Sequence, residues 1–406
     1  MRLLILLILV AGLLSCSKDA GIKTGPWRGI IQLQGQELPF NLELFKEGDE
    51  YKAFVKNGEE KILLDEIKVT GDSVKITMHI FDIDLRARID GDKLTGWYVK
   101  NYERDYRLPF EANFGETFRF TESSGNDPAV NFEGKFAVTF IHDQKDTTLG
   151  VALIDQNGDK ATGTFLTPLG DYRFLEGNVV DGKLMLSTFD GNHAFLFYAT
   201  KQGDSLLGEF YSGKSWFERW TGVRTESASL PHPESLTYLK EGYEKLDFSF
   251  PDLNGNPVSN TDSRFQNKVV ILQLFGSWCP NCMDETKFLS EWYKQNRHRG
   301  VEILGLAYER KADFEYAAGR VNKMKDKLGV EYHFAIAGTY EKEEASKTLP
   351  ALNRVVAFPT MIFVGKDGKV KHIHTGFEGP GTGIYYERFK ERFNQIINEC
   401  LAEPPV

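Results

Sequence analysis

The chain has 406 residues, of which 41% are hydrophobic and 26% are charged, a composition typical of globular proteins with two or three hydrophobic cores. Its formal net charge of −9 argues against nucleic acid as a partner, because binding phosphates requires a basic surface. After residue 15 no apolar run is long enough to cross a bilayer, so we do not expect an integral membrane protein.

Residues 1–15 have the features of a secretory signal peptide. Arg2 precedes an apolar run over residues 3–14 that is too short for a membrane span. The run ends in Leu13-Leu14-Ser15-Cys16, which resembles the lipobox of bacterial lipoproteins, where the cysteine is acylated and becomes the new amino terminus. This resemblance implies lipidation of Cys16, a tether over residues 16–24 and anchoring on the periplasmic side of the cell envelope. The alternative is an ordinary secretory signal with an unrelated cysteine.

Residues 25–225 alternate between apolar and polar positions and are punctuated by hairpin signals. Such signals include Asn57-Gly58, Asp90-Gly91 and Asn157-Gly158. Many short strands at this spacing predict an all-β region built as an antiparallel sandwich or barrel.

This β region is predicted to be duplicated, with one unit at 25–120 and a second at 121–225. Three pairs of segments match in order, namely 27–29 with 132–134, 71–74 with 180–184, and 91–98 with 203–211. We place the joint at residues 121–127, and we expect the β units to pack separately from the rest of the chain.

Residues 226–240 contain prolines and small polar residues and are predicted to be a linker. The pattern then changes. A continuous apolar strand at 269–275 is followed by a helix from 279 to 297, strands at 301–307 and 360–364, and a last helix from about 384. Alternating strands and helices predict an α/β domain over residues 241–406.

Cys279 and Cys282 form a Cys-x-x-Cys motif where the buried strand becomes a helix. Free backbone N–H groups and the positive dipole end at a helix start stabilise a thiolate, so Cys279 is predicted as the nucleophile. Cys282 lies one turn inside and is predicted to act second. Pro280 fits the first helical position because its missing N–H costs nothing there. The fourth cysteine, Cys400, lies on the apolar face of the last helix and is predicted to be a buried hydrophobe.

A Cys-x-x-Cys pair can instead be half of a zinc site, which needs two further ligands. The chain has no second cysteine pair, and the remaining candidates are His372 and His374 on a predicted strand. We therefore predict no metal site and no organic cofactor.

The segments 248–255, Gly276-Ser277-Trp278-Cys279 and Phe358-Pro359-Thr360 carry a family resemblance. From about residue 246 to the end, the chain resembles the thioredoxin superfamily and its TlpA/ResA-like branch of bacterial thiol–disulfide oxidoreductases. The resemblance implies a thioredoxin fold with Pro359 in a cis-proline loop that faces the cysteines. It also implies substrate contacts from a set of residues around the dithiol, namely Trp278, Pro280, Asn281, Phe358 and Pro359.

Two features depart from cytosolic thioredoxins. Gln273 stands where they carry a buried acid, and Glu285 follows Cys282 by one helical turn, as in the Cys-x-x-Cys-x-x-Glu pattern of ResA-like proteins. We predict that Glu285 transfers a proton for Cys282, and the alternative is a surface charge that compensates the helix dipole. The dipeptide Pro280-Asn281 leaves the direction of electron flow open.

These features predict a lipid-anchored thiol–disulfide oxidoreductase. The resemblance suggests that it reduces disulfides of exported proteins, cytochrome c precursors among them, with electrons from a membrane thiol donor. One alternative is a thiol peroxidase, because the 246–255 segment is shared with peroxiredoxin-like domains. Another is a lipoprotein whose β units bind a ligand or partner as its main function.

Overall fold

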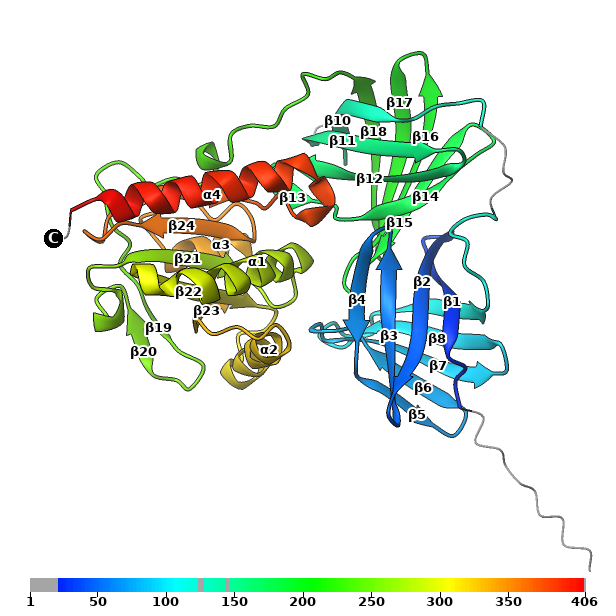
Figure 1. Ribbon diagram of the computed structural model, residues 1–406, viewed down its shortest axis with the longest axis horizontal. Helices are drawn as coiled ribbons and strands as arrows, with labels where there is room; N and C mark the ends of the chain where they lie inside the picture. The colour runs from blue at the N-terminus through cyan, green and yellow to red at the C-terminus, as the bar shows by residue number, and fades with distance from the viewer. Residues whose placement is uncertain (1–20, 123–127, 143–145, 405–406) are drawn as a thin grey trace, which may run out of the picture.

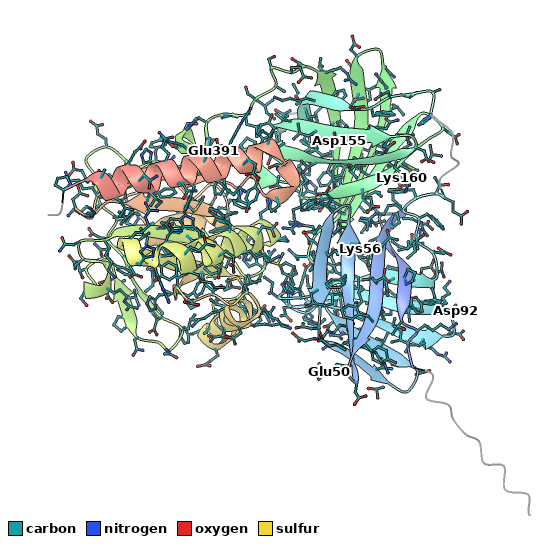
Figure 2. The ribbon with its side chains drawn as sticks, viewed as in Figure 1. Glu50, Lys56, Asp92, Asp155, Lys160 and Glu391 are labelled. Carbon is teal, nitrogen blue, oxygen red and sulfur yellow. The ribbon has the colours of Figure 1, made fainter. Side chains whose placement is uncertain are left out.

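The computed structural model describes residues 21–122, 128–142 and 146–404 (Figure 1). The predicted signal peptide, Cys16 and most of the tether lie outside this range, as does most of the predicted joint between the β units. Exposed charged residues such as Glu50, Asp92 and Glu391 point away from the ribbon (Figure 2). Within the described range, no helix is long and apolar enough to cross a membrane.

The first β unit is a nine-stranded antiparallel sheet in which the first strand pairs with both the second and the last. Its edges are the fourth and fifth strands, so the sheet stays open. Its strands are β1 (Gly25–Leu33), β2 (Gln36–Glu47), β3 (Glu50–Asn57), β4 (Glu60–Leu64), β5 (Ile67–Thr70), β6 (Ser73–Thr77), β7 (Ile83–Asp90), β8 (Lys93–Lys100) and β9 (Arg107–Phe114).

The second β unit is also a nine-stranded antiparallel sheet, and the additional pairing of β11 with β12 closes it into a barrel. Aromatic side chains, among them Phe140, Phe165 and Trp220, fill its interior. Its strands are β10 (Gly134–Ile141), β11 (Thr147–Asn157), β12 (Lys160–Thr167), β13 (Gly170–Asp171), β14 (Leu175–Val180), β15 (Lys183–Phe189), β16 (Ala194–Gln202), β17 (Ser205–Ser212) and β18 (Trp216–Arg224).

The two β units share their order of strands. In the second unit too, the first strand pairs with the second and the last, as β10 does with β11 and β18. Two pairs of matched sequence segments fall at equivalent hairpins. The β5–β6 hairpin of the first unit corresponds to the β14–β15 hairpin of the second, and the β7–β8 hairpin corresponds to the β16–β17 hairpin.

The carboxy-terminal part is a five-stranded mixed sheet with helices. Its central strand is β21, which pairs in parallel with β22 and antiparallel with β24, and every residue of β21 is buried. A separate two-stranded sheet, β19 (Ser249–Pro251) and β20 (Pro257–Ser259), precedes it. The five-stranded sheet and the helices are β21 (Val269–Phe275), α1 (Pro280–Asn296), β22 (Val301–Glu309), α2 (Phe314–Lys327), β23 (His333–Thr339), α3 (Lys342–Thr348), β24 (Thr360–Val364), β25 (Val370–Thr375) and α4 (Ile384–Ala402).

Helices α1 and α4 contact each other through aromatic side chains. The ring centroids of Phe288 and Phe393 lie 5.0 Å apart, and Phe393 also lies 5.6 Å from Phe363 of β24. Cys400 is buried on α4, as predicted, and burial raises the pKa of its thiol to about 11. The architecture confirms the predicted fold class, an all-β region followed by a thioredoxin fold.

The expectation that the β units pack separately from the redox domain is wrong. The first unit contacts α2, where Lys323 forms an ion pair with Glu66 at 2.7 Å and the Tyr316 hydroxyl donates to Asp82 at 3.1 Å. The second unit contacts the start of α1. Strand alternation and turn signals describe each unit alone, so they carry no information about these contacts between units.

Candidate active site

The local fold places Cys279 at the junction between the central strand and the first helix. β21 ends at Phe275, and a short turn leads to Cys279, which is the N-cap of α1 with extended backbone angles. The Cys279 sulfur accepts a hydrogen bond from the backbone N–H of Cys282 at 3.2 Å. This bond gives the sulfur one of the free N–H groups of the helix start, an arrangement that stabilises a thiolate.

The two thiols differ in access to solvent. Both are free thiols in the structure, and Cys279 is 6% exposed whereas Cys282 is fully buried. Burial and the neighbouring Cys279 raise the pKa of Cys282 well above its ordinary value. A buried thiol with a raised pKa carries little thiolate near neutral pH and is a poor first nucleophile, so the geometry favours attack by Cys279.

The loop before β24 faces the redox pair. The Phe358–Pro359 peptide bond is cis, and the Cys279 thiol donates to the Phe358 carbonyl at a sulfur–oxygen distance of 3.6 Å. Pro359 is buried, and its carbonyl accepts from the backbone N–H of Gly376 at 3.0 Å.

Glu285 is fully buried beneath Cys282, so it is not an exposed charge at the start of the helix. One carboxyl oxygen, Oε2, accepts from the Gln273 side-chain amide at 2.9 Å, and the Tyr332 hydroxyl donates to the Gln273 carbonyl at 3.0 Å. The other oxygen, Oε1, has no hydrogen-bond partner among the described residues. Burial raises the pKa of Glu285 to about 8, so its proton is held near neutral pH and can be exchanged there.

A second buried acid, Glu309 at the end of β22, fixes the turn before Cys279. Its carboxyl group accepts from the backbone N–H and from the hydroxyl of Ser277, both at 2.8 Å. Burial raises the pKa of Glu309. The adjacent Trp278 donates its indole N–H to the Tyr308 carbonyl at 2.9 Å, and the Arg310 guanidinium lies 4.2 Å from the Trp278 ring centroid. The tryptophan beside the nucleophile is therefore held in place from two sides.

Arg173 of the second β unit binds the start of α1. Its side chain is 1% exposed and donates to the Pro280 carbonyl at 3.0 Å. It forms ion pairs with Asp284 of α1, with Glu60 of the first β unit and, at 3.3 Å, with Asp190 of the second. One buried guanidinium thus joins all three parts of the molecule beside the redox pair. A buried charge needs such partners, because its desolvation is otherwise costly.

Two further contacts join the second β unit to the active-site turn, and a third joins it to the loop before α4. Asn281 donates to the Asp171 carbonyl at 3.0 Å, and Asn192 donates to the Trp278 carbonyl at 2.9 Å. The Asp171 carboxyl group accepts from the Gly379 N–H at 2.6 Å, and burial raises its pKa to about 7. Gly170 has a φ of 137°, and a Cβ there would lie 2.7 Å from the Asn281 amide nitrogen, so the close approach requires glycine.

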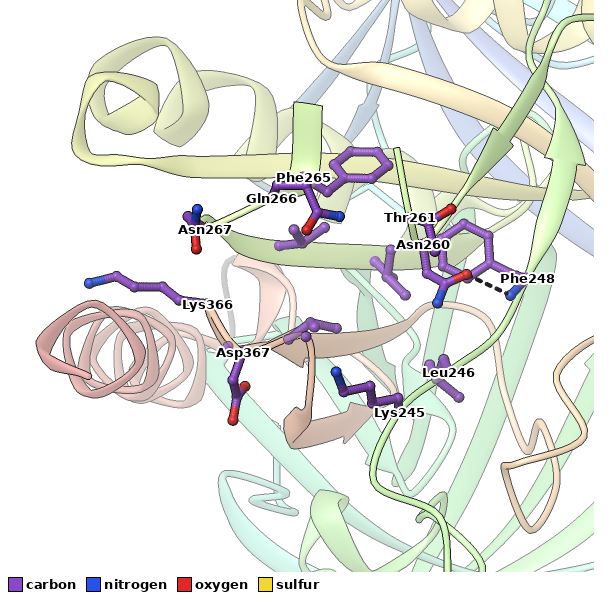
Figure 3. A pocket seen from close by; sticks show the side chains of 15 residues that line it. Lys245, Leu246, Phe248, Asn260, Thr261, Phe265, Gln266, Asn267, Lys366 and Asp367 are labelled. Carbon is purple, nitrogen blue, oxygen red and sulfur yellow. Dashed lines mark hydrogen bonds between the residues drawn. The ribbon is translucent and has the colours of Figure 1, made fainter. Parts of the chain in front are cut away.

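A groove of about 410 Å³ opens at the redox pair between these parts. Cys279, Trp278, Asn281 and Phe358 line it, but Cys282, Pro280 and Pro359 do not. Another pocket, of about 450 Å³, lies near the beginning of β21, at the end of the strand away from the cysteines (Figure 3). Because Lys245, Phe248 and Lys366 line that pocket and no cysteine does, it offers no redox chemistry.

The structure brings together the residues that the sequence predicts around the dithiol, and it adds others. Arg173, Asp171 and Asn192 come from the β region, more than 80 residues before Cys279, and no local pattern distinguishes them from surface residues. The sequence gives only a weak indication of a role for Glu309, namely that it is an acid at the end of an apolar strand. The alternative metal ligands lie elsewhere, with His372 3.5 Å from Glu234 and His374 3.4 Å from Glu378. Among the described residues, no cluster of histidine, cysteine and acidic side chains could hold a metal ion.

A reactive thiol at a helix start, a buried partner one turn inside and a facing cis-proline loop define a dithiol–disulfide exchange site on a thioredoxin fold. Comparison with known proteins agrees with this class. The Redoxin family matches residues 240–387, which begin after both β units. The thiol–disulfide oxidoreductase ResA of Geobacillus thermodenitrificans is 31% identical over 141 residues, which are 34% of this chain and 72% of that protein.

The chain is also similar to two further proteins. ResA of Bacillus subtilis is 25% identical over 138 residues, 34% of this chain and 69% of that protein. A solved structure described as a putative thiol:disulfide interchange protein DsbE from Chlorobium tepidum is 22% identical, with a TM-score of 0.32, and the match covers 41% of this chain and 100% of that one. The chain belongs to the TlpA/ResA-like branch of the thioredoxin superfamily, the thiol–disulfide oxidoreductases.

Proposed function

We propose that the protein reduces disulfides of exported proteins, with Cys279 as nucleophile and Cys282 as resolving thiol. The observation that carries this proposal is the asymmetry of the pair. Cys279 lines an open groove, whereas Cys282 is fully buried behind it. Such an arrangement lets a substrate disulfide reach one sulfur and leaves the other for the intramolecular step.

The proposed reaction has two displacements. The Cys279 thiolate attacks one sulfur of the substrate disulfide, forms a mixed disulfide and expels the first substrate thiolate, which takes a proton. Cys282 then loses its proton and attacks the Cys279 sulfur, which releases the second substrate thiolate. The substrate gains two electrons and two protons, and the protein is left with a Cys279–Cys282 disulfide that a membrane thiol donor would reduce.

Glu285 is the proposed acceptor of the Cys282 proton. Its pKa of about 8 is far above that of an ordinary carboxyl group and therefore nearer to the raised pKa of the Cys282 thiol, which makes Glu285 a better proton acceptor than an ordinary carboxylate. Gln273 cannot take this role because an amide does not ionise in this range, but it holds the Glu285 carboxyl group in position. Substrate contacts are proposed for Trp278, Asn281 and Phe358 at the groove and for Pro280 and Pro359 behind it.

The test compares two oxidants. Fully reduced protein is mixed in turn with hydroxyethyl disulfide and with hydrogen peroxide, and the appearance of the Cys279–Cys282 disulfide is followed by mass. We expect faster oxidation by the disulfide, and a reduction potential more negative than about −200 mV in glutathione buffers, as for reducing members of the superfamily. Faster oxidation by peroxide would instead make the protein a thiol peroxidase, and a potential near about −120 mV would make it an oxidant.

The proposed location is the periplasmic side of the cell envelope, where a lipid on Cys16 would hold the protein near its donor. Support comes from the Leu13-Leu14-Ser15-Cys16 pattern, and cytochrome c precursors are candidate substrates in that compartment. We expect protein extracted from membranes to begin at Cys16 and to carry acyl groups, as measured by intact mass. Cys16→Ala should release it into the soluble fraction, and an unmodified amino terminus at another residue would contradict the anchor.

A further inference from the structure

The second β unit supplies the wall of the groove that faces Cys279. Trp278 and Phe358 stand on the redox side, and residues from β10 to β18 form the opposite side. Arg173 and Asp171 tie this unit to the first turn of α1. The wall therefore has a fixed position relative to the nucleophile.

This wall, which we call the aromatic wall, consists of Tyr172, Phe195, Phe210 and Trp216. The Tyr172 ring centroid lies 5.2 Å from those of Phe195 and Phe210, in edge-to-face contact. Trp216 is 47% exposed at the rim, and the His142 ring stacks on it at 3.9 Å. Tyr172 and Phe195 are half-buried and Phe210 belongs to the barrel core, so the aromatic surface that a ligand can reach comes from Trp216 and from the free edges of Tyr172 and Phe195. Accessible aromatic surface beside a reactive sulfur is typical of a site that buries an apolar group of a ligand.

The charges of the described lining favour uncharged ligands over anionic ones. None of the described residues that line it is a lysine or an arginine, and its two acids are Asp171 and Glu218. Burial raises the pKa of both carboxyl groups, to about 7 for Asp171, which reduces the negative charge of the groove relative to two ordinary carboxylates. The described lining therefore offers an acidic ligand no lysine or arginine, whereas an uncharged apolar side chain meets the aromatic wall.

We propose that the groove binds the segment of a substrate protein around its disulfide and selects a large aromatic side chain next to the cysteine. This inference rests on the proposed reductase function. The substrate sulfur must reach Cys279, so the neighbouring side chain of the substrate enters the remaining volume between Trp278 and the aromatic wall. A volume of about 410 Å³ accommodates a peptide of a few residues with one aromatic side chain.

The experiment measures which disulfides the full-length reduced protein prefers. The probes are disulfide-linked dimers of the peptides Gly-Phe-Cys-Phe-Gly and Gly-Ser-Cys-Ser-Gly, together with hydroxyethyl disulfide as a small reference. We expect the second-order rate constant for oxidation of the reduced protein by the phenylalanine peptide to exceed that for the serine peptide by about tenfold, the effect of partly burying one aromatic side chain. Trp216→Ala and Phe195→Ala should each reduce this ratio to about two or less, and Trp216→Phe should largely restore it.

Trp97→Ala is the matched control, because Trp97 is 42% exposed on β8 of the other β unit and does not line the groove, and it should leave the ratio at its wild-type value. Reduction of hydroxyethyl disulfide with equal rates for the two peptides would overturn the groove proposal and leave the reductase function standing. A ratio that survives both alanine substitutions would also overturn it. If the protein reduces none of the three disulfides, both the reductase function and the groove proposal are overturned.

Discussion

Replacement of Cys279 by serine should abolish thiol–disulfide exchange, with the rate falling to that of the uncatalysed reaction, a loss on the order of 10³-fold or more. A serine hydroxyl does not ionise at neutral pH and cannot form a disulfide. Cys282 cannot take over, because it is fully buried and its pKa is raised. The measurement is the reduction of hydroxyethyl disulfide by the fully reduced variant.

Cys282→Ser should behave differently. The first displacement remains possible, but the mixed disulfide on Cys279 cannot be resolved, so adducts with substrate should accumulate and be visible by mass under non-reducing conditions. Cys400→Ser is the control, since Cys400 is buried on α4, away from the groove, and should change neither result. If iodoacetamide labels Cys282 of the reduced protein before Cys279, the assignment of roles is reversed.

Glu285→Gln should slow resolution of the mixed disulfide by about 10²-fold or somewhat less at pH 8, the usual effect of losing a general base. In the wild type the resolving rate should rise through pH of about 8 as Glu285 ionises, and the variant should lose this rise. Glutamine keeps the shape and can still accept from Gln273, so folding should be retained. Stopped-flow measurement of the second displacement against pH tests the prediction, and an unchanged profile would show that another group takes the proton.

The same substitution has a second consequence, for stability. Because burial raises the pKa of Glu285 from 4.5 to about 8, the folded protein holds this proton more tightly than the unfolded chain. The tighter binding of this proton contributes fully to the free energy of unfolding below about pH 4.5, and the contribution is lost as pH rises toward 8. The difference in free energy of unfolding between Glu285→Gln and the wild type should therefore shift in favour of the variant when the pH is raised from 5 to 9, as measured by urea unfolding. The matched control is Glu291→Gln, because Glu291 lies on the same helix but pairs with Lys294 at the surface.

Much of the redox domain could be predicted from the sequence because its signals are local. An apolar run, as at 269–275, indicates a buried strand, and Pro280 directly after Cys279 indicates the start of a helix. Spacing alone placed Cys282 and Glu285 on one side of the helix, because residues three apart lie on the same face. Hairpin signals likewise predicted the all-β region, since tight turns need particular residues.

Only the tertiary structure decided what the β region does beside the dithiol. Arg173 and Asp171 bind the start of α1 across 107 to 111 residues of sequence, and Trp216 lines the same groove as Cys279. Neither strand alternation nor turn chemistry encodes which part of a barrel meets which helix. The burial of Glu285 could not be predicted either, because the position of an acid in a helix does not reveal whether a neighbouring sheet covers it. Burial and pairing across domains depend on how whole surfaces fit together, and that fit sets the pKa of Glu285 and the wall opposite Cys279.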